Sequence, residues 1–212
     1  MRAALVVITC TVVALAGCSG DSKPAAAPKD GSTAPVIAPG RPGEAARTLS
    51  PGEAATAVPS PTANAVDVTF MQDMIIHHRQ ALDMAILAPT RAKSEKLKGL
   101  AARIKDAQGP EIQYMTTWLQ EQGQKVPEHH AAHDGMPGMA TPEQLAALKA
   151  ATGVEFDRLF LSLMIAHHQG AITMATKVIG DGSHQRISEL AADIGVEQTA
   201  EIRRMQEMQA AL

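Results

Sequence analysis

Cysteine and aromatic residues are almost missing from this chain of 212 residues. It has two cysteines, both within the first eighteen positions, and one tryptophan, one tyrosine and three phenylalanines. So few aromatic residues argue against a surface that stacks nucleic-acid bases. Its 19 basic and 22 acidic residues give a net charge of −3, and no basic run stands out. We therefore expect no nucleic acid as a partner.

The amino-terminal segment has the features of an export signal. Arg2 precedes an apolar run from Ala3 to Ala16, which is too short to span a bilayer, and residues 15–18 read Leu-Ala-Gly-Cys. This ending resembles a bacterial lipobox, which implies that residues 1–17 are a lipoprotein signal peptide and that Cys18 is lipidated. The mature chain would then be exported and anchored by its lipid at the outer face of the cell membrane. The alternative is an ordinary signal or a tail anchor.

The mature chain divides into a tether and one domain. Under the lipobox interpretation no free thiol remains, so any soft metal ligand must be methionine, of which ten follow the initiator. Residues 18–64 contain eight of the thirteen prolines and few large apolar residues, which predicts a disordered Pro/Ala-rich tether. Residues 65–212 are numerous enough to bury the core of a single domain.

That domain contains an internal duplication with an offset of ninety residues. Residues 70–85 read FMQDMIIHHRQALDMA, and residues 160–175 read FLSLMIAHHQGAITMA. At the same offset, a pattern LAxxIxxxQxxEIxxM begins at Leu100 and recurs at Leu190. Both patterns have helical spacing, so each repeat is a pair of helices. The repeats are residues 65–123 and 154–212, and residues 124–153 form a crossover.

The predicted fold is an all-α four-helix bundle made of two repeated helical hairpins, with a long central crossover and a short extra helix. Its helices are expected at residues 66–88, 97–122, 142–150, 154–179 and from 183 towards 212. Pro89 should end the first helix, and Pro110 should cause a kink or a restart in the second. Thr141 and Ser183 are the expected N-caps, and Gly123 the expected C-terminal cap. No segment alternates with period two, so no strands are expected.

Paired histidines lie inside the repeated helices. On a helical wheel His78 and His168 fall near the centre of the apolar face, and His77 and His167 at its edge. One interpretation is structural: neutral histidines form hydrogen bonds to Glu111 and Glu201, a polar network in which Gln108 and Gln198 are further core partners. In the other, Met74 and its histidines form a metal site, because spacings of three or four residues place them on one helical surface.

A second group of donors lies in the crossover. Within eleven residues the chain has three histidines and two methionines: His129, His130, His133, Met136 and Met139. Thioethers suit Cu(I), and imidazole also suits Cu(II), so the mixture without cysteine indicates copper outside the cytoplasm. The alternative is a simple turn at Pro137-Gly138 with solvated histidines.

The paired FxxxMIxHHxxAxxMA segments, the paired LAxxIxxxQxxEIxxM segments and the intervening MPGM resemble the domain-of-unknown-function 305 family over residues 67–208. The resemblance implies a ferritin-like bundle that is often exported or lipid-anchored, in a family that includes periplasmic copper-binding proteins. By position it singles out these residues: Met74, His77, His78, Met84, Met136, Met139, Met164, His167, His168 and Met174.

The sequence therefore leaves two functions open. The first is an extracytoplasmic, lipid-anchored protein that sequesters or transfers copper, as Cu(I) or Cu(II), and needs no metal to fold. The second is a non-catalytic module, with an envelope protein or a second copy as its partner, whose histidines bind only Glu and Gln. We expect no enzyme, because the Glu-x-x-His signature of ferritin-like oxidases is absent from the sequence.

Overall fold

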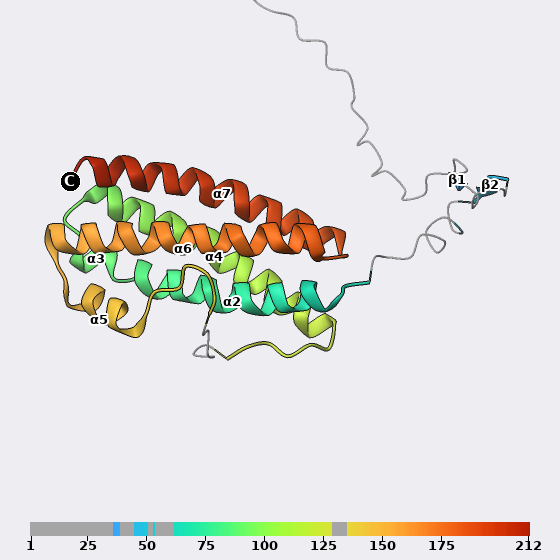
Figure 1. Ribbon diagram of the computed structural model, residues 1–212, viewed down its shortest axis with the longest axis horizontal. Helices are drawn as coiled ribbons and strands as arrows, with labels where there is room; N and C mark the ends of the chain where they lie inside the picture. Colours follow the sequence, from blue (N-terminus) through green and yellow to red (C-terminus); the bar gives the residue numbers. More distant parts are fainter. Residues whose placement is uncertain (1–35, 39–44, 51–52, 54–61, 129–134) are drawn as a thin grey trace, which may run out of the picture. The chain divides into compact units, whose positions relative to one another are not determined.

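The structure, a computed structural model, describes residues 36–38, 45–50, 53, 62–128 and 135–212 (Figure 1). The chain forms two units, residues 1–58 and 59–212. In the first unit, strands β1 (Val36–Ala38) and β2 (Arg47–Leu49) form a short antiparallel pair in which Val36 lies opposite Leu49. The expectation of no strands was wrong here. The signal segment and Cys18 lie outside the described residues.

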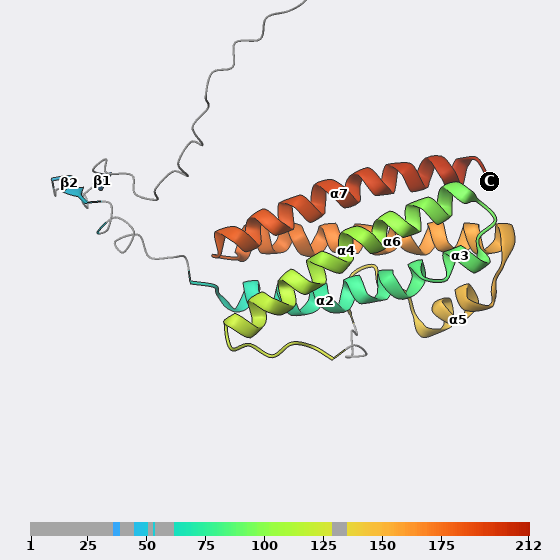
Figure 2. The same ribbon diagram turned by 180° about the vertical axis from the view of Figure 1, so that it is seen from behind.

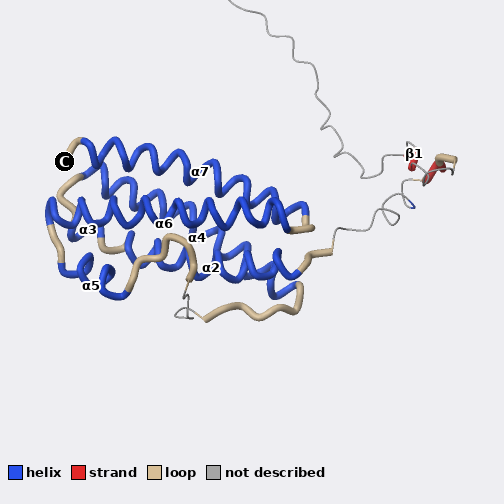
Figure 3. The backbone as a smooth tube through the Cα atoms, viewed as in Figure 1, coloured by secondary structure: helices blue, strands red, loops and turns tan. Residues whose placement is uncertain are grey.

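The second unit is a bundle of four long helices (Figures 1 and 2). They are α2 (Ala65–Ala85), α4 (Glu95–Glu121), α6 (Gly153–Asp181) and α7 (Gln185–Ala210). Helix α2 packs against α4 and α6, and α6 packs against α7. Two short helices, α3 (Ala88–Arg91) and α5 (Pro142–Ala150), lie in the connections (Figure 3). The predicted architecture of two helical hairpins, a long crossover and a short extra helix is confirmed.

Several helix ends follow the local signals in the sequence. Thr141 caps α5, and its hydroxyl and the Gln144 side chain exchange hydrogen bonds with each other's backbone amides. Gly123 ends α4 with a φ of 64°, which favours glycine. Its N–H donates to Gln120 O while the next N–H donates to Leu119 O, as in a Schellman motif.

Other helix ends differ from the prediction. Helix α4 runs without interruption through Pro110, which lies on its exposed side, so the chain does not restart there. Helix α2 ends at Ala85, and Pro89 lies in the first turn of α3. The N-cap of α7 is His184, while the Ser183 hydroxyl donates to the carbonyl of residue 62.

Two buried aspartates link the repeats. Asp157 of α6 accepts hydrogen bonds from the backbone N–H groups of Lys93 and Ser94, which immediately precede α4, at 3.0 and 2.9 Å. Asp67 of α2 accepts the backbone N–H of Ser183, which lies two residues before α7, at 3.0 Å. The first helix of each repeat thus stabilises the start of the second helix of the other repeat, where an anion is favourable. This role accounts for the recurrence of aspartate at the same repeat position.

The core consists of two apolar clusters at opposite ends of the bundle. One joins the C-terminal half of α2 to the N-terminal halves of α4 and α6 and the C-terminal half of α7. The other joins the four remaining halves. Both lie within the second unit, which therefore has a core of its own. No helix among the described residues is long and apolar enough to cross a membrane.

Candidate metal centre

Four fully buried histidines lie in the middle of the bundle, between the two apolar clusters. Helix α2 contributes His77 and His78, and α6 contributes His167 and His168. The rings of His77 and His167 face each other with centroids 3.7 Å apart and planes tilted by 38°. The helical wheel placed these two at the edge of the apolar face, whereas they lie at the contact between α2 and α6. We call the four residues the histidine layer.

Each hairpin contains one histidine–carboxylate pair in this layer. His78 Nε2 lies 2.8 Å from Glu111 Oε2 on α4, and His168 Nε2 lies 2.7 Å from Glu201 Oε2 on α7. When the Nε2–H donates to the carboxylate, the neutral ring keeps a lone pair on Nδ1. Both Nδ1 atoms are buried and have no hydrogen-bond partner among the described residues. Metal-ligating histidines commonly have such a carboxylate on the other ring nitrogen.

His167 is held in its neutral form. Burial lowers its pKa well below 6.5, and the nearby rings of His77, His168 and His78 lower it further, while the backbone of His77 opposes the shift with a smaller effect. Neither ring nitrogen makes a hydrogen bond of ordinary geometry to the described residues. Neutral imidazole is the form that binds metals. A buried polar atom without a partner costs about 1–3 kcal/mol, which a bound metal would offset.

The end of the crossover packs over the histidine layer. Pro137 O lies 3.0 Å from His77 Nε2. The Gln80 side chain makes two hydrogen bonds to Ala140: its Oε1 accepts from the backbone N–H at 2.7 Å, and its Nε2 donates to the backbone carbonyl at 3.0 Å. Gly138, with a φ of 77°, lies so close to Gly170 of α6 that a side chain at either position would overlap backbone atoms. Sequence reasoning missed this contact, although two glycines in the MPGM and HHQG segments are its signal.

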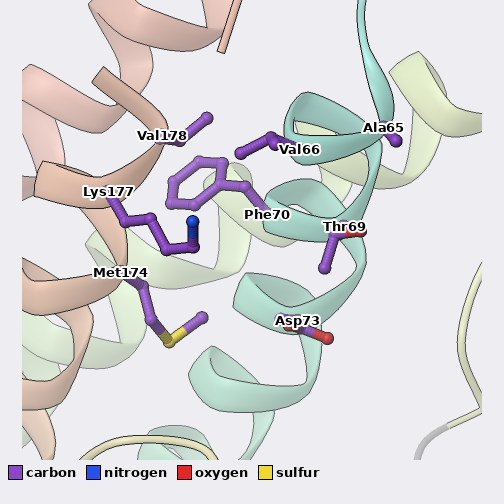
Figure 4. Close-up of a pocket in the computed structure, with 8 residues that line it drawn as sticks. All are labelled: Ala65, Val66, Thr69, Phe70, Asp73, Met174, Lys177 and Val178. Carbon is purple, nitrogen blue, oxygen red and sulfur yellow. The ribbon is translucent and has the colours of Figure 1, made fainter. Parts of the chain in front are cut away.

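The predicted methionines lie in different surroundings. Met74 and Met164 are fully buried, each one turn before the second histidine of its repeat. Met84 is fully buried in an apolar cluster. Met174 is partly buried and lines an apolar pocket between α2 and α6, together with Phe70 (Figure 4).

Of the crossover donors, the structure describes two. Met136 and Met139 are half-buried beside the Pro137-Gly138 turn. The three crossover histidines, His129, His130 and His133, lie outside the described residues. His184 is the N-cap residue of α7, and its ring lies edge-on to Trp118 with centroids 5.7 Å apart.

Gln108 and Gln198 are both buried. Both amide atoms of Gln108 and of Gln198 lack a hydrogen bond to described residues. The hydrogen bond to His78 comes instead from Glu111, three residues after Gln108 on α4. Among the described residues, no three or more His, Cys, Asp or Glu side chains are arranged to hold a metal ion.

The fold and the layer define an all-α, ferritin-like four-helix bundle with a buried centre of imidazoles. The chain belongs to the family described as Domain of unknown function (DUF305), whose sequence profile matches residues 67–209. No protein with a curated functional description matches it.

Solved structures of the same family are similar to this chain. A DUF305 fragment from Deinococcus radiodurans is 34% identical, with a TM-score of 0.66 over 72% of this chain and 100% of that one. A presumed secreted DUF305 protein from Streptomyces coelicolor is 29% identical, with a TM-score of 0.64 over 69% and 93%. CopM in its Cu(II)-bound form is 36% identical, with a TM-score of 0.61 over 68% and 96%. CopM has also been solved with Cu(I) and with silver.

Proposed function

We propose that this protein is an exported copper-binding protein that sequesters copper or hands it on without chemical turnover. The observation that carries the proposal is the pair of histidines, His78 and His168, whose Nε2 atoms are oriented by carboxylates and whose buried Nδ1 atoms have no partner among the described residues. That arrangement suits a metal ligand, because in a fully satisfied hydrogen-bond network the Nδ1 atoms would have partners as well. The similarity to CopM, a protein solved with Cu(I), Cu(II) and silver bound, supports copper as the metal.

The donors divide by the chemistry they offer. Imidazoles of the histidine layer suit Cu(II) as well as Cu(I), whereas the thioethers of Met74 and Met164 select Cu(I). The rings of His77 and His167, with centroids 3.7 Å apart, are further imidazole donors of the layer. The remaining proposed donors lie outside the layer: Met84, Met174 and the crossover residues His129, His130, His133, Met136 and Met139.

The second candidate is a structural or interaction module, with an envelope protein or a second copy as its partner. The two histidine–glutamate hydrogen bonds favour it, because they partly satisfy the buried rings without a metal. The lack, among the described residues, of a triad of His, Cys, Asp or Glu arranged for a metal favours it too. Under this interpretation the layer fixes the register of the bundle, and any metal binding belongs to the crossover.

Export and lipid anchoring rest on the amino-terminal sequence. The presumed secreted relative from Streptomyces coelicolor supports export. Anchoring requires a diacylated Cys18, which mass spectrometry of the mature protein from a bacterial membrane fraction would detect. A Cys18→Ala variant should then be absent from that fraction or keep its signal. A wild-type chain found without lipid would exclude the anchor and leave the copper proposal standing.

Competition for Cu(I) tests the proposal. The domain from residue 59 to residue 212 is titrated, without a histidine tag, against a chromophoric Cu(I) chelator under reducing conditions. The double variant H78L/H168L should lose tight binding, because it removes both open Nδ1 donors. The control His184→Gln changes a histidine outside the layer and should bind as the wild type does. If the wild type fails to compete, or if H78L/H168L retains full stoichiometry, the assignment of the histidine layer is wrong.

A further inference from the structure

The hydrogen bond between His78 and Glu111 fixes the register of α2 against α4. The two helices are antiparallel, as Figures 1 and 2 show. The residue four positions before His78 on α2 is Met74, and the residue four positions after Glu111 on α4 is Met115. Because the helices are antiparallel, these two residues lie at the same level. The bond between His168 and Glu201 sets the same register between α6 and α7, which puts Met164 level with Met205.

Burial agrees with this register. All four methionines are fully buried. Met74 and Met115 belong to one apolar cluster, and Met164 and Met205 belong to the other. Each histidine–carboxylate pair is thus followed, one helical turn or about 6 Å along the bundle, by a pair of thioethers from the same two helices.

The direction of the side chains brings His78 and Met115 towards one another. Side chains on a helix lean towards its N-terminus, so His78 leans over Met74. On the antiparallel helix, Met115 leans back towards Glu111 and hence towards the histidine. The His78 Nδ1 atom has no hydrogen-bond partner among the described residues. His168, Met164 and Met205 repeat this relation in the second hairpin.

We propose that Met115 and Met205 are metal ligands that complete two equivalent soft-metal sites, one in each repeat. The sites are His78, Met74 and Met115 in the first hairpin and His168, Met164 and Met205 in the second. One imidazole and two thioethers form a neutral donor set that selects Cu(I) or Ag(I) over harder divalent ions. The carboxylate bonded to each histidine compensates the single positive charge of such an ion in the buried interior.

This inference rests on the proposed function, and it adds a stoichiometry of two, a preference for monovalent soft ions and two ligands. It also explains why the repeated pattern of the second and fourth helices ends in methionine. A core position could use leucine equally well, because methionine and leucine fill similar volumes. Metal coordination gives the thioether a purpose that packing alone does not supply.

The test uses Ag(I) as a redox-inert probe and the methyl groups of methionine as reporters. The soluble domain is labelled with ¹³C at its methionine methyl groups and titrated with Ag(I). The M115L/M205L variant assigns two of the signals. The inference predicts that the methyl signals of Met74, Met115, Met164 and Met205 move together and stop at two Ag(I) per chain. Unmoved signals from Met115 and Met205 at full loading would overturn it.

Affinity gives a second readout with a matched control. M115L/M205L should bind Ag(I) at least about tenfold more weakly than wild type, a change of about 1.4 kcal/mol per site. The control M71L/M208L replaces one methionine packed with each apolar cluster, outside the proposed sites, and should change affinity by less than about twofold. If H78L/H168L loses binding while M115L/M205L matches the wild type, this inference fails and the proposed function stands. If the wild type binds no Ag(I) or Cu(I), both fail.

Discussion

Replacement of Gly170 by alanine tests the contact between the crossover and the histidine layer. A methyl group at this position would overlap the backbone carbonyl of Pro137 and approach the Gly138 Cα to 2.9 Å. Backbone atoms cannot move aside as a flexible side chain can, so the crossover must withdraw from α6. Its withdrawal breaks the hydrogen bond between His77 Nε2 and Pro137 O.

The cost follows from three terms. Overpacking costs about 1–3 kcal/mol, and the loss of a hydrogen bond by a buried group costs about 1–3 kcal/mol. Alanine in a helix regains about 0.5–1 kcal/mol relative to glycine. We therefore expect G170A to lower the free energy of unfolding by about 1–5 kcal/mol.

The assay is urea unfolding of the domain, followed by circular dichroism, with Gly180→Ala as the matched control. Gly180 lies in the same helix, and a methyl group there would meet no atom within 4 Å. G180A should raise stability by about 0.5–1 kcal/mol. A G170A variant as stable as G180A would refute the packing of the crossover on α6.

Three further predictions concern stability. Asp157→Ala removes the buried acceptor of the backbone N–H groups of Lys93 and Ser94 and should cost about 2–3 kcal/mol in urea unfolding, with Asp157→Asn recovering part of the loss. The lowered pKa of His167 means that, as pH falls below about 6.5, only the unfolded state takes up a proton on this residue. The metal-free wild type should therefore lose stability relative to H167N, by up to about 1.4 kcal/mol per pH unit between pH 6.5 and the lowered pKa. Parallel pH profiles of the two proteins would contradict this. Pro110→Ala should raise the free energy of unfolding by about 1–2 kcal/mol, and with it the melting temperature, because it removes an exposed proline from the uninterrupted helix α4.

The helices and their order were predictable because two independent signals agreed. Helical periodicity identified each segment, and the ninety-residue duplication required the same arrangement twice. Local caps such as Thr141 and Gly123 depend on neighbouring residues alone, so they too were predictable. The strands β1 and β2 span three residues each, too few for an alternating pattern to show.

The burial of His77 and His167 was not predictable from a helical wheel. A wheel assigns one buried face to a helix, but α2 packs against α4 and α6 and also lies beneath the crossover. Its buried side chains therefore extend almost around the helix, from Met71 through Ile76 to Gln80. The tertiary neighbours determined which histidines meet, and no local pattern contains that information.

The hydrogen bonds that hold the crossover were also hidden from sequence reasoning. His77 and Gln80 interact with backbone groups of Pro137 and Ala140, and every residue has such groups. Similarly, the expected kink or restart at Pro110 followed from the local effect of proline. Residues of α4 before and after Pro110 pack in the two apolar clusters, so the chain does not restart there.

The most direct test of the central claim is the anomalous diffraction of copper in crystals of the domain loaded with Cu(I). The account predicts anomalous peaks inside the bundle, within bonding distance of His78 Nδ1 and His168 Nδ1. Copper found only at the crossover or on the surface, with both histidine–glutamate pairs unchanged, would contradict it. The histidine layer would then be a structural element of the bundle.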